Sequence, residues 1–115
     1  MEDTLISLLE SLEYPVYRQG SIAEDEPYPA TFFTFWNRSE DGISFYDNSD
    51  YLVSHSFDVN VYSSNVSLAY SLQRAARDLL KSNGWTITER GYDVSSDEVT
   101  HIGRGFSCLY LEQIQ

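Results

Sequence analysis

The segment from Tyr51 to Tyr62 constrains the fold most, because apolar and polar side chains alternate along it and a helix pattern follows directly. Its odd positions are apolar or aromatic apart from His55, and its even positions include Ser54, Ser56, Asp58 and Asn60. Successive side chains of a β-strand point to opposite faces of a sheet. We therefore expect a strand with one face on a core and the other facing water or a partner.

Hydrophobic spacing and turn residues predict the other helices and strands. Leucines at three- and four-residue spacing, after the acidic first turn of Glu2 and Asp3, predict a helix over residues 2–13 that Tyr14-Pro15 ends. A second helix is expected from about Asn65 to Ser82, capped by Ser63, Ser64 or Asn65 and followed by Gly84. Further strands are expected over residues 16–18, 30–38, 85–89 and 101–112.

These elements follow one another as α-β-β-β-α-β-β in a single domain of residues 1–115. Most strand pairs can be antiparallel, so the expected fold is α+β, a mainly antiparallel sheet with two helices packed on one face. The strand at 30–38 is apolar on both faces, which is typical of an interior strand or of a strand with a second packed side. Residues 39–50 exceed an ordinary hairpin turn and form either a projecting arm or hairpin, or a loop that orders on binding.

The net charge of −11 is unevenly distributed along the chain. Residues 1–58 hold twelve acidic against two basic residues, whereas residues 59–115 hold six against five. This balance excludes nucleic-acid binding through a general phosphate-neutralising surface. It leaves three interpretations: solubility alone, a surface for a basic partner, or the lining of a passage through which DNA slides without sticking.

No motif predicts catalysis or a bound metal. Cys108 is the only cysteine and the two histidines are far apart, so a zinc site is not supported, and we expect Cys108 to be a buried thiol. His55 is expected to be a hydrogen-bonded core or edge residue. The stretch Asp47-Asn48-Ser49-Asp50 lacks the glycine and glutamate of a calcium loop. Gly103 and Gly105 predict a bulge or a close backbone approach in a strand rather than a phosphate loop.

We expect no enzyme activity, no cofactor and no membrane association. There is no nucleophile–base pair or metal-ligand set, and no run of 18 apolar residues. The acidic start Met1-Glu2-Asp3 does not resemble a secretory signal.

The order of four segments resembles a known class of proteins. These segments are Pro29-Ala30-Thr31-Phe32-Phe33-Thr34-Phe35, then Phe57-Asp58-Val59-Asn60-Val61-Tyr62-Ser63, then the helix ending at Gly84, then Gly105-Phe106-Ser107. Over roughly residues 1–112 this pattern is similar to the small tail-terminator and tail-completion proteins of long-tailed bacteriophages, the head–tail joining class.

The resemblance implies a structural protein without catalysis or cofactor. It implies a ring, commonly of six subunits, that caps the tail tube and connects it to the head. Implied partners are further copies of the chain, tail-tube proteins and head-completion or connector proteins, with DNA passing through the ring without specific binding. The ring forms on assembly, and the free chain is either already a ring or a monomer that assembles only on a tube end. The implied location is the virion tail or neck, assembled in the cytoplasm of the bacterial host.

A ring of identical subunits needs two complementary patches on each subunit. The sequence offers the 39–50 arm for one patch and the basic stripe of the second helix for the other. Two isolated cations, Arg38 and Arg104, can pair with a carboxylate across a contact or within the chain. The interface candidates are therefore Arg38, Phe45, Tyr46, Asp47, Arg74, Arg77, Lys81 and Arg104.

A small acidic binding or inhibitor protein that engages a basic partner is the alternative function. Its small size, acidic half and aromatic content are consistent with this class. An inhibitor forms a salt-sensitive one-to-one complex with a cationic protein, whereas a ring protein forms homo-oligomers or joins tail tubes. Self-association therefore separates the two hypotheses.

Overall fold

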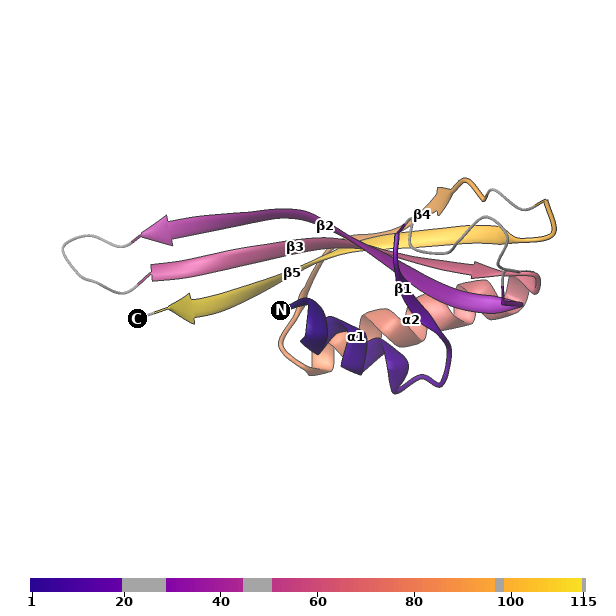
Figure 1. Cartoon of the computed structure of the whole chain (residues 1–115), viewed down its shortest axis with the longest axis horizontal. Helices are drawn as coiled ribbons and strands as arrows, with labels where there is room; N and C mark the ends of the chain where they lie inside the picture. Colours follow the sequence, from indigo (N-terminus) through magenta and orange to yellow (C-terminus); the bar gives the residue numbers. More distant parts are fainter. Residues whose placement is uncertain (20–28, 45–50, 97–98, 115) are drawn as a thin grey trace.

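In the computed structural model, which describes residues 1–19, 29–44, 51–96 and 99–114, two helices lie on one face of a five-stranded sheet (Figure 1). The elements in chain order are α1 (Glu2–Glu10), β1 (Val16–Arg18), β2 (Thr31–Ser44), β3 (Tyr51–Ser63), α2 (Val66–Ser82), β4 (Thr86–Val94) and β5 (Ile102–Ile114). The α+β class and the element order expected from the sequence are confirmed.

The sheet has the strand order β1-β2-β3-β5-β4, with β3 at its centre. β1 pairs with β2 in parallel, and the other three pairs are antiparallel. The alternation along β3 places Phe57, Val59 and Val61 on the helix side, where each is fully buried. Burial of these side chains between the sheet and the helices supplies the main driving force for folding.

β2 is an interior strand, as its apolar content on both faces predicts. It lies between β1 and β3, with Phe33 and Phe35 buried in the core beneath the helices. Phe32 faces the other way and is also buried, because its ring stacks on Tyr62 with centroids 5.3 Å apart and meets Tyr17 edge-on at 5.9 Å. Aromatic pairs at these distances stabilise a sheet face that neither helix covers.

Asn65 and Gly84 mark the two ends of α2. The Oδ1 of Asn65 accepts a hydrogen bond from the backbone N–H of Leu68 at 3.1 Å, so Asn65 is the N-cap among the three candidates. Gly84 follows the helix with a φ of +89°, a left-handed conformation that favours glycine. Between these caps, the helix buries Ala69, Ala76 and Leu80 against the sheet.

Replacing Asn65 by alanine is expected to lower the free energy of unfolding by about 1 kcal/mol, because one backbone N–H of the first turn loses its acceptor. Urea denaturation followed by circular dichroism measures this change. The matched control is Ser64→Ala, an exposed neighbour, for which we expect a change within about 0.5 kcal/mol. Equal effects of the two substitutions would show that the cap contributes nothing.

α1 ends earlier than predicted, at Glu10 rather than residue 13. The backbone N–H of Ser11 still bonds to carbonyls of the last turn, but Glu13 adopts a φ of 72° and reverses the chain. This reversal must be complete before Tyr14, because the following Pro15 disfavours a helical conformation there. The chain thereby enters β1 next to β2.

The predicted 39–50 connection is a strand over its first half. β2 and β3 remain paired as far as Ser44 and Tyr51, after a bulge between Asn37 and Ser39, while residues 45–50 lie outside the described part of the chain. β5 continues beside β3 to its end at Ile114. The ends of these three strands extend past the helices (Figure 1). We call residues 39–44, 51–56 and 109–114 the arm.

β4 extends to Val94, five residues beyond the predicted strand. Its side chains fill the space above the two glycines of β5: a Cβ at Gly103 would lie 2.6 Å from Val94 Cγ2, and one at Gly105 would lie 2.5 Å from Tyr92 Cε1. The glycines therefore mark a close approach, as expected from their position in a strand. The packing of Tyr92 and Val94 over these glycines stabilises the end of β4, although the sequence of this segment is polar.

Candidate subunit-interface surfaces

A basic groove lies between the C-terminal half of α2 and the start of β4. We use this name for the cavity of about 390 Å³ lined by Arg77, Asp78, Lys81, Trp85, Thr86, Ile87 and Arg90. α2 contributes two cations one helical turn apart, and β4 contributes the third. Three cations face one carboxylate at this site, in a chain whose net charge is −11.

The cations of the basic groove lie close enough to affect one another. The pKa of Arg77 is lowered, first by burial and then by the positive charge of Arg90, with Arg74 and Arg104 adding and Asp78 opposing. One Nη of Arg77 donates to the backbone carbonyl of Arg90, which holds β4 against α2. An anionic segment bound in the groove would relieve this repulsion.

The arm is acidic and contains no lysine or arginine in residues 39–56 or 109–114. At its base, His55 is buried between two carboxylates: its Nε2 lies 2.9 Å from Glu112 Oε1, and its Nδ1 lies 3.6 Å from Glu40 Oε1. His55 is therefore the partnered histidine that its apolar strand face predicts. These contacts join β2, β3 and β5, so the arm is a cross-linked sheet.

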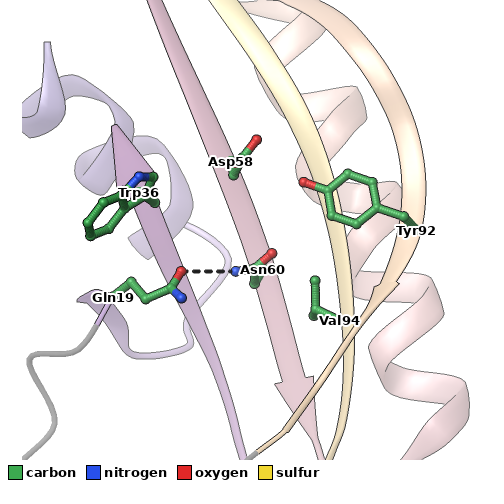
Figure 2. Close-up of a pocket in the computed structure, with 6 residues that line it drawn as sticks. All are labelled: Gln19, Trp36, Asp58, Asn60, Tyr92 and Val94. Carbon is green, nitrogen blue, oxygen red and sulfur yellow. Dashed lines mark hydrogen bonds between the residues drawn. The ribbon is translucent and has the colours of Figure 1, made fainter. Parts of the chain in front are cut away.

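A second cavity, the open-face pocket, lies on the sheet face opposite the helices. It has a volume of about 300 Å³ and is lined by Gln19, Trp36, Asp58, Asn60, Tyr92 and Val94. Figure 2 shows Trp36 and Tyr92 on opposite sides of the pocket, with Asp58 and Asn60 between them. Trp36 is 50% exposed, although it lies in the strand that buries three phenylalanines.

Hydrogen bonds fix the floor of the open-face pocket. Asn60 Nδ2 donates to Gln19 Oε1 at 3.3 Å, the contact drawn in Figure 2, and to Thr34 Oγ1 at 3.4 Å. The hydroxyl of Ser107 donates to Asp58 Oδ1 at 2.7 Å. Asn60 Oδ1 is buried and has no hydrogen-bond partner in the part of the chain that the structure describes.

The predicted interface residues fall into three groups. Arg77 and Lys81 line the basic groove and Arg74 is exposed beside them on α2, whereas Phe45, Tyr46 and Asp47 lie outside the described residues. Arg38 and Arg104 both have internal ion pairs, the second of the two alternatives that the sequence leaves open.

Arg104 lies on the face of the sheet that the helices cover. Its Nη1 is 2.7 Å from Asp93 Oδ1, and its Nε donates a hydrogen bond to Gln73 Oε1. Its guanidinium lies over the Tyr70 ring, 4.7 Å from the ring centroid. Arg38 lies 3.8 Å from Asp58 Oδ1 and 3.7 Å from Glu89 Oε1. Arg38 is half exposed and remains accessible, whereas the side chain of Arg104 is mostly buried.

Sequence reasoning missed Arg90 and Trp36. Arg90 lies in a segment expected to be a connection, and only the folding of β4 against α2 places it beside Arg77. Trp36 follows two inward-facing phenylalanines at odd positions, so period-two alternation assigns it to the opposite, exposed face. The alternation therefore indicates an exposed Trp36 from the sequence alone.

Chemistry at Cys108 is suppressed by its surroundings. The thiol is 1% exposed, and burial, with the nearby Asp58 carboxylate adding, raises its pKa to about 12. A neutral thiol is a poor nucleophile and a poor metal ligand. Among the described residues no group of three or more His, Cys, Asp or Glu side chains could hold a metal ion. No helix in the described ranges has the length and hydrophobicity needed to cross a bilayer.

Comparison with known proteins finds similarity to solved structures but not to protein-family models or curated proteins. No protein-family model and no curated protein matches the chain. In fold, it is similar to a chain from a solved structure of the "Virion of native gene transfer agent (GTA) particle", with a TM-score of 0.64 and 14% sequence identity. The match covers 96% of this chain and 84% of that chain. At this identity the likeness shows a shared fold.

Proposed function

We propose that this chain is a structural protein of a phage-like virion. The observation that carries the proposal is the fold shared with a chain of a gene transfer agent virion over 96% of the sequence. The neighbour is a component of a particle, and the match spans 96% of this chain and 84% of that chain, so the shared unit is a whole domain. The acidic composition and the buried thiol are compatible with a role in assembly.

The more specific role that we propose is tail termination, tail completion or head–tail joining. In this role the chain forms a ring on the tail tube and connects it to the head. The order of elements supports it, since the four segments on which the sequence resembles that class fall at β2, β3, α2 and β5, in that order. A net charge of −11 supports it further, because an acidic ring repels DNA and lets it pass without trapping it.

The proposed subunit contact joins the arm of one copy to the basic groove of the next. The arm presents carboxylates without a lysine or arginine, and the groove presents Arg77, Lys81 and Arg90 against Asp78 alone. The two surfaces differ, so the contact is heterologous and generates a ring when the rotation closes. Opposite charges also steer and register the incoming subunit.

Reversing two groove charges with Lys81→Glu and Arg90→Glu is expected to abolish assembly. Both side chains are exposed, so the fold should be retained. Acidic groups facing an acidic arm cost several kcal/mol, which corresponds to a rise of roughly 100-fold or more in the concentration needed for half assembly. Analytical ultracentrifugation across a concentration series measures this change.

The control is Arg74→Glu, an exposed change on α2 that does not line the groove and should leave assembly within about threefold of the unaltered chain. A further variant combines the groove reversal with Asp41→Lys, a charge reversal in the arm that leaves Glu40 and Glu112 beside His55 and should restore assembly. If Arg74→Glu disrupts assembly as strongly as the groove reversal, or if the combined variant stays monomeric, the proposed contact is wrong.

A second candidate function, a small acidic protein that binds a basic partner, is favoured by the half-exposed Trp36 beside Asp58. Self-association distinguishes the two functions. A virion ring protein assembles with itself, whereas a binder remains monomeric and forms a one-to-one complex with a cationic protein that weakens as salt increases.

A further inference from the structure

Two hydrogen-bond acceptors line the open-face pocket, the amide oxygen of Asn60 and the carboxylate of Asp58. Asn60 is 5% exposed, and its Oδ1 has no donor among the described residues. In Figure 2 this oxygen points toward the space between Asp58 and Tyr92. Asp58 adds a carboxylate whose side chain is 30% exposed. Asn60 Oδ1 is itself buried, so the Asp58 carboxylate is the acceptor that a ligand meets first. A buried acceptor without a donor is unfavourable in the free protein, so a donor that reaches past Asp58 to Asn60 would be stabilised there.

Aromatic rings flank these acceptors on both sides. Trp36 is half exposed on β2, and Tyr92 rises from β4 on the far side of the pocket (Figure 2). A cation placed over the face of a tryptophan or tyrosine is attracted by the ring quadrupole. Arginine and lysine donate hydrogen bonds and accept none, so they match a site with spare acceptors between aromatic rings.

The electrostatic environment of the open-face pocket is negative. Arg38 lies near both Asp58 and Glu89, so one cation offsets two carboxylates at this edge of the pocket. The pKa of Tyr92 is raised, mainly by burial, with the negative charges of Asp58 and Glu89 adding to the effect. A negative site in a chain of net charge −11 attracts cations and disfavours anions.

We infer that the open-face pocket binds one arginine or lysine side chain presented by a partner protein. The volume of about 300 Å³ is at the small end of ligand sites and suits one side chain of a larger partner rather than a helix or a cofactor. Tryptophan at such a position is a frequent anchor of protein–protein contacts. The inference goes beyond ring formation, because the pocket lies on the sheet face opposite α2 and does not overlap the basic groove.

The test uses a peptide, Gly-Gly-Arg-Gly-Gly, and its neutral counterpart with citrulline in place of arginine. The protein is the full chain carrying Lys81→Glu and Arg90→Glu, so the result is independent of ring assembly. The chain contains two tryptophans, and Trp36→Phe assigns the indole N–H signal of Trp36. We expect the arginine peptide to shift this signal in a saturable way, and the citrulline peptide to bind at least roughly 10-fold more weakly.

Two variants locate the binding site. Asp58→Asn keeps the shape and the acceptor for Ser107 but removes the charge, and it should weaken binding of the arginine peptide by roughly 10-fold. Trp36→Leu should weaken it by roughly threefold or more, measured on the backbone amides of β3. Arg74→Glu, on the helix side, should leave binding unchanged.

Three results would overturn the inference. The Kd expected for a single side chain is roughly millimolar. The first contradicting result is no shift of the Trp36 signal at an arginine-peptide concentration about 20-fold above that Kd. The second is an equal response to the citrulline peptide. The third is a shift of Trp36 by a neutral sugar such as N-acetylglucosamine without one by the arginine peptide, which would make the pocket a carbohydrate site.

Discussion

Replacing Phe57 by alanine is expected to lower the free energy of unfolding by about 3 to 5 kcal/mol. Phe57 is fully buried in β3, the central strand, and its ring lies 6.3 Å from that of Phe35 and 5.9 Å from that of Trp85. Truncation removes buried apolar surface and leaves a cavity between the sheet and α2. Urea denaturation monitored by far-ultraviolet circular dichroism gives the change.

The matched control is Trp36→Ala, which removes an even larger ring from the neighbouring strand. Trp36 is half exposed on the opposite sheet face, so its loss should cost about 2 kcal/mol, less than the loss of Phe57. If Trp36→Ala lowered the free energy of unfolding as much as Phe57→Ala, side chains on the open sheet face would stabilise the fold as strongly as those on the helix side. That result would contradict the burial pattern described above.

Alkylation of Cys108 by iodoacetamide at pH 8 is expected to be slower in the folded protein than in urea by about 10³-fold or more. Burial raises the pKa of the folded thiol to about 12, from an ordinary value of 9.0. The reactive thiolate is therefore about 10³-fold scarcer at pH 8 in the folded chain, and burial limits access further. Mass spectrometry of samples quenched at intervals measures both rates.

The same pKa shift predicts how stability depends on alkaline pH. Between pH 9 and 12 the unfolded chain loses the thiol proton while the folded chain retains it, so the Cys108 contribution lowers stability as pH rises. Below pH 9 the thiol is protonated in both states and contributes no slope. Cys108→Ala should flatten the stability profile above pH 9, and an unchanged profile together with fast alkylation of the folded chain would show that Cys108 is accessible.

The sequence predicts best where local pattern and tertiary environment agree. The alternation in β3 holds because one face is buried against the helices, and Asn65 and Gly84 mark the ends of α2 because their capping roles depend on local backbone geometry. The position of β2 inside the sheet follows from the phenylalanines on both of its faces. These features suffice for the α+β class and the order of elements.

The sequence predicts least where polar segments are ordered by their neighbours. Residues 39–44 look like a loop because they are polar, but pairing with β3 makes them strand. The end of β4 is also polar, and it forms because Tyr92 and Val94 fill the space over Gly105 and Gly103. Both surfaces that we assign a role depend on such pairings.

The basic groove combines α2 with β4, and the open-face pocket combines residues from β2, β3 and β4 with Gln19. Charge composition reveals that cations are concentrated in the second half of the chain, but not that Arg90 meets Arg77. Strand register places Trp36 opposite Asp58, and it places Tyr92 opposite Gly105, whose other neighbour is Asn60. Neither arrangement can be obtained from spacing along the chain.

The measurement that tests the central claim most directly is the absolute mass of the chain in solution, by light scattering across a wide concentration range at low and moderate salt. A structural ring protein that assembles through the arm and the basic groove should form one discrete oligomer, near six subunits, that dissociates as salt increases. A chain that remains at its monomer mass of 13.2 kDa at every concentration and salt level would contradict self-assembly through these surfaces.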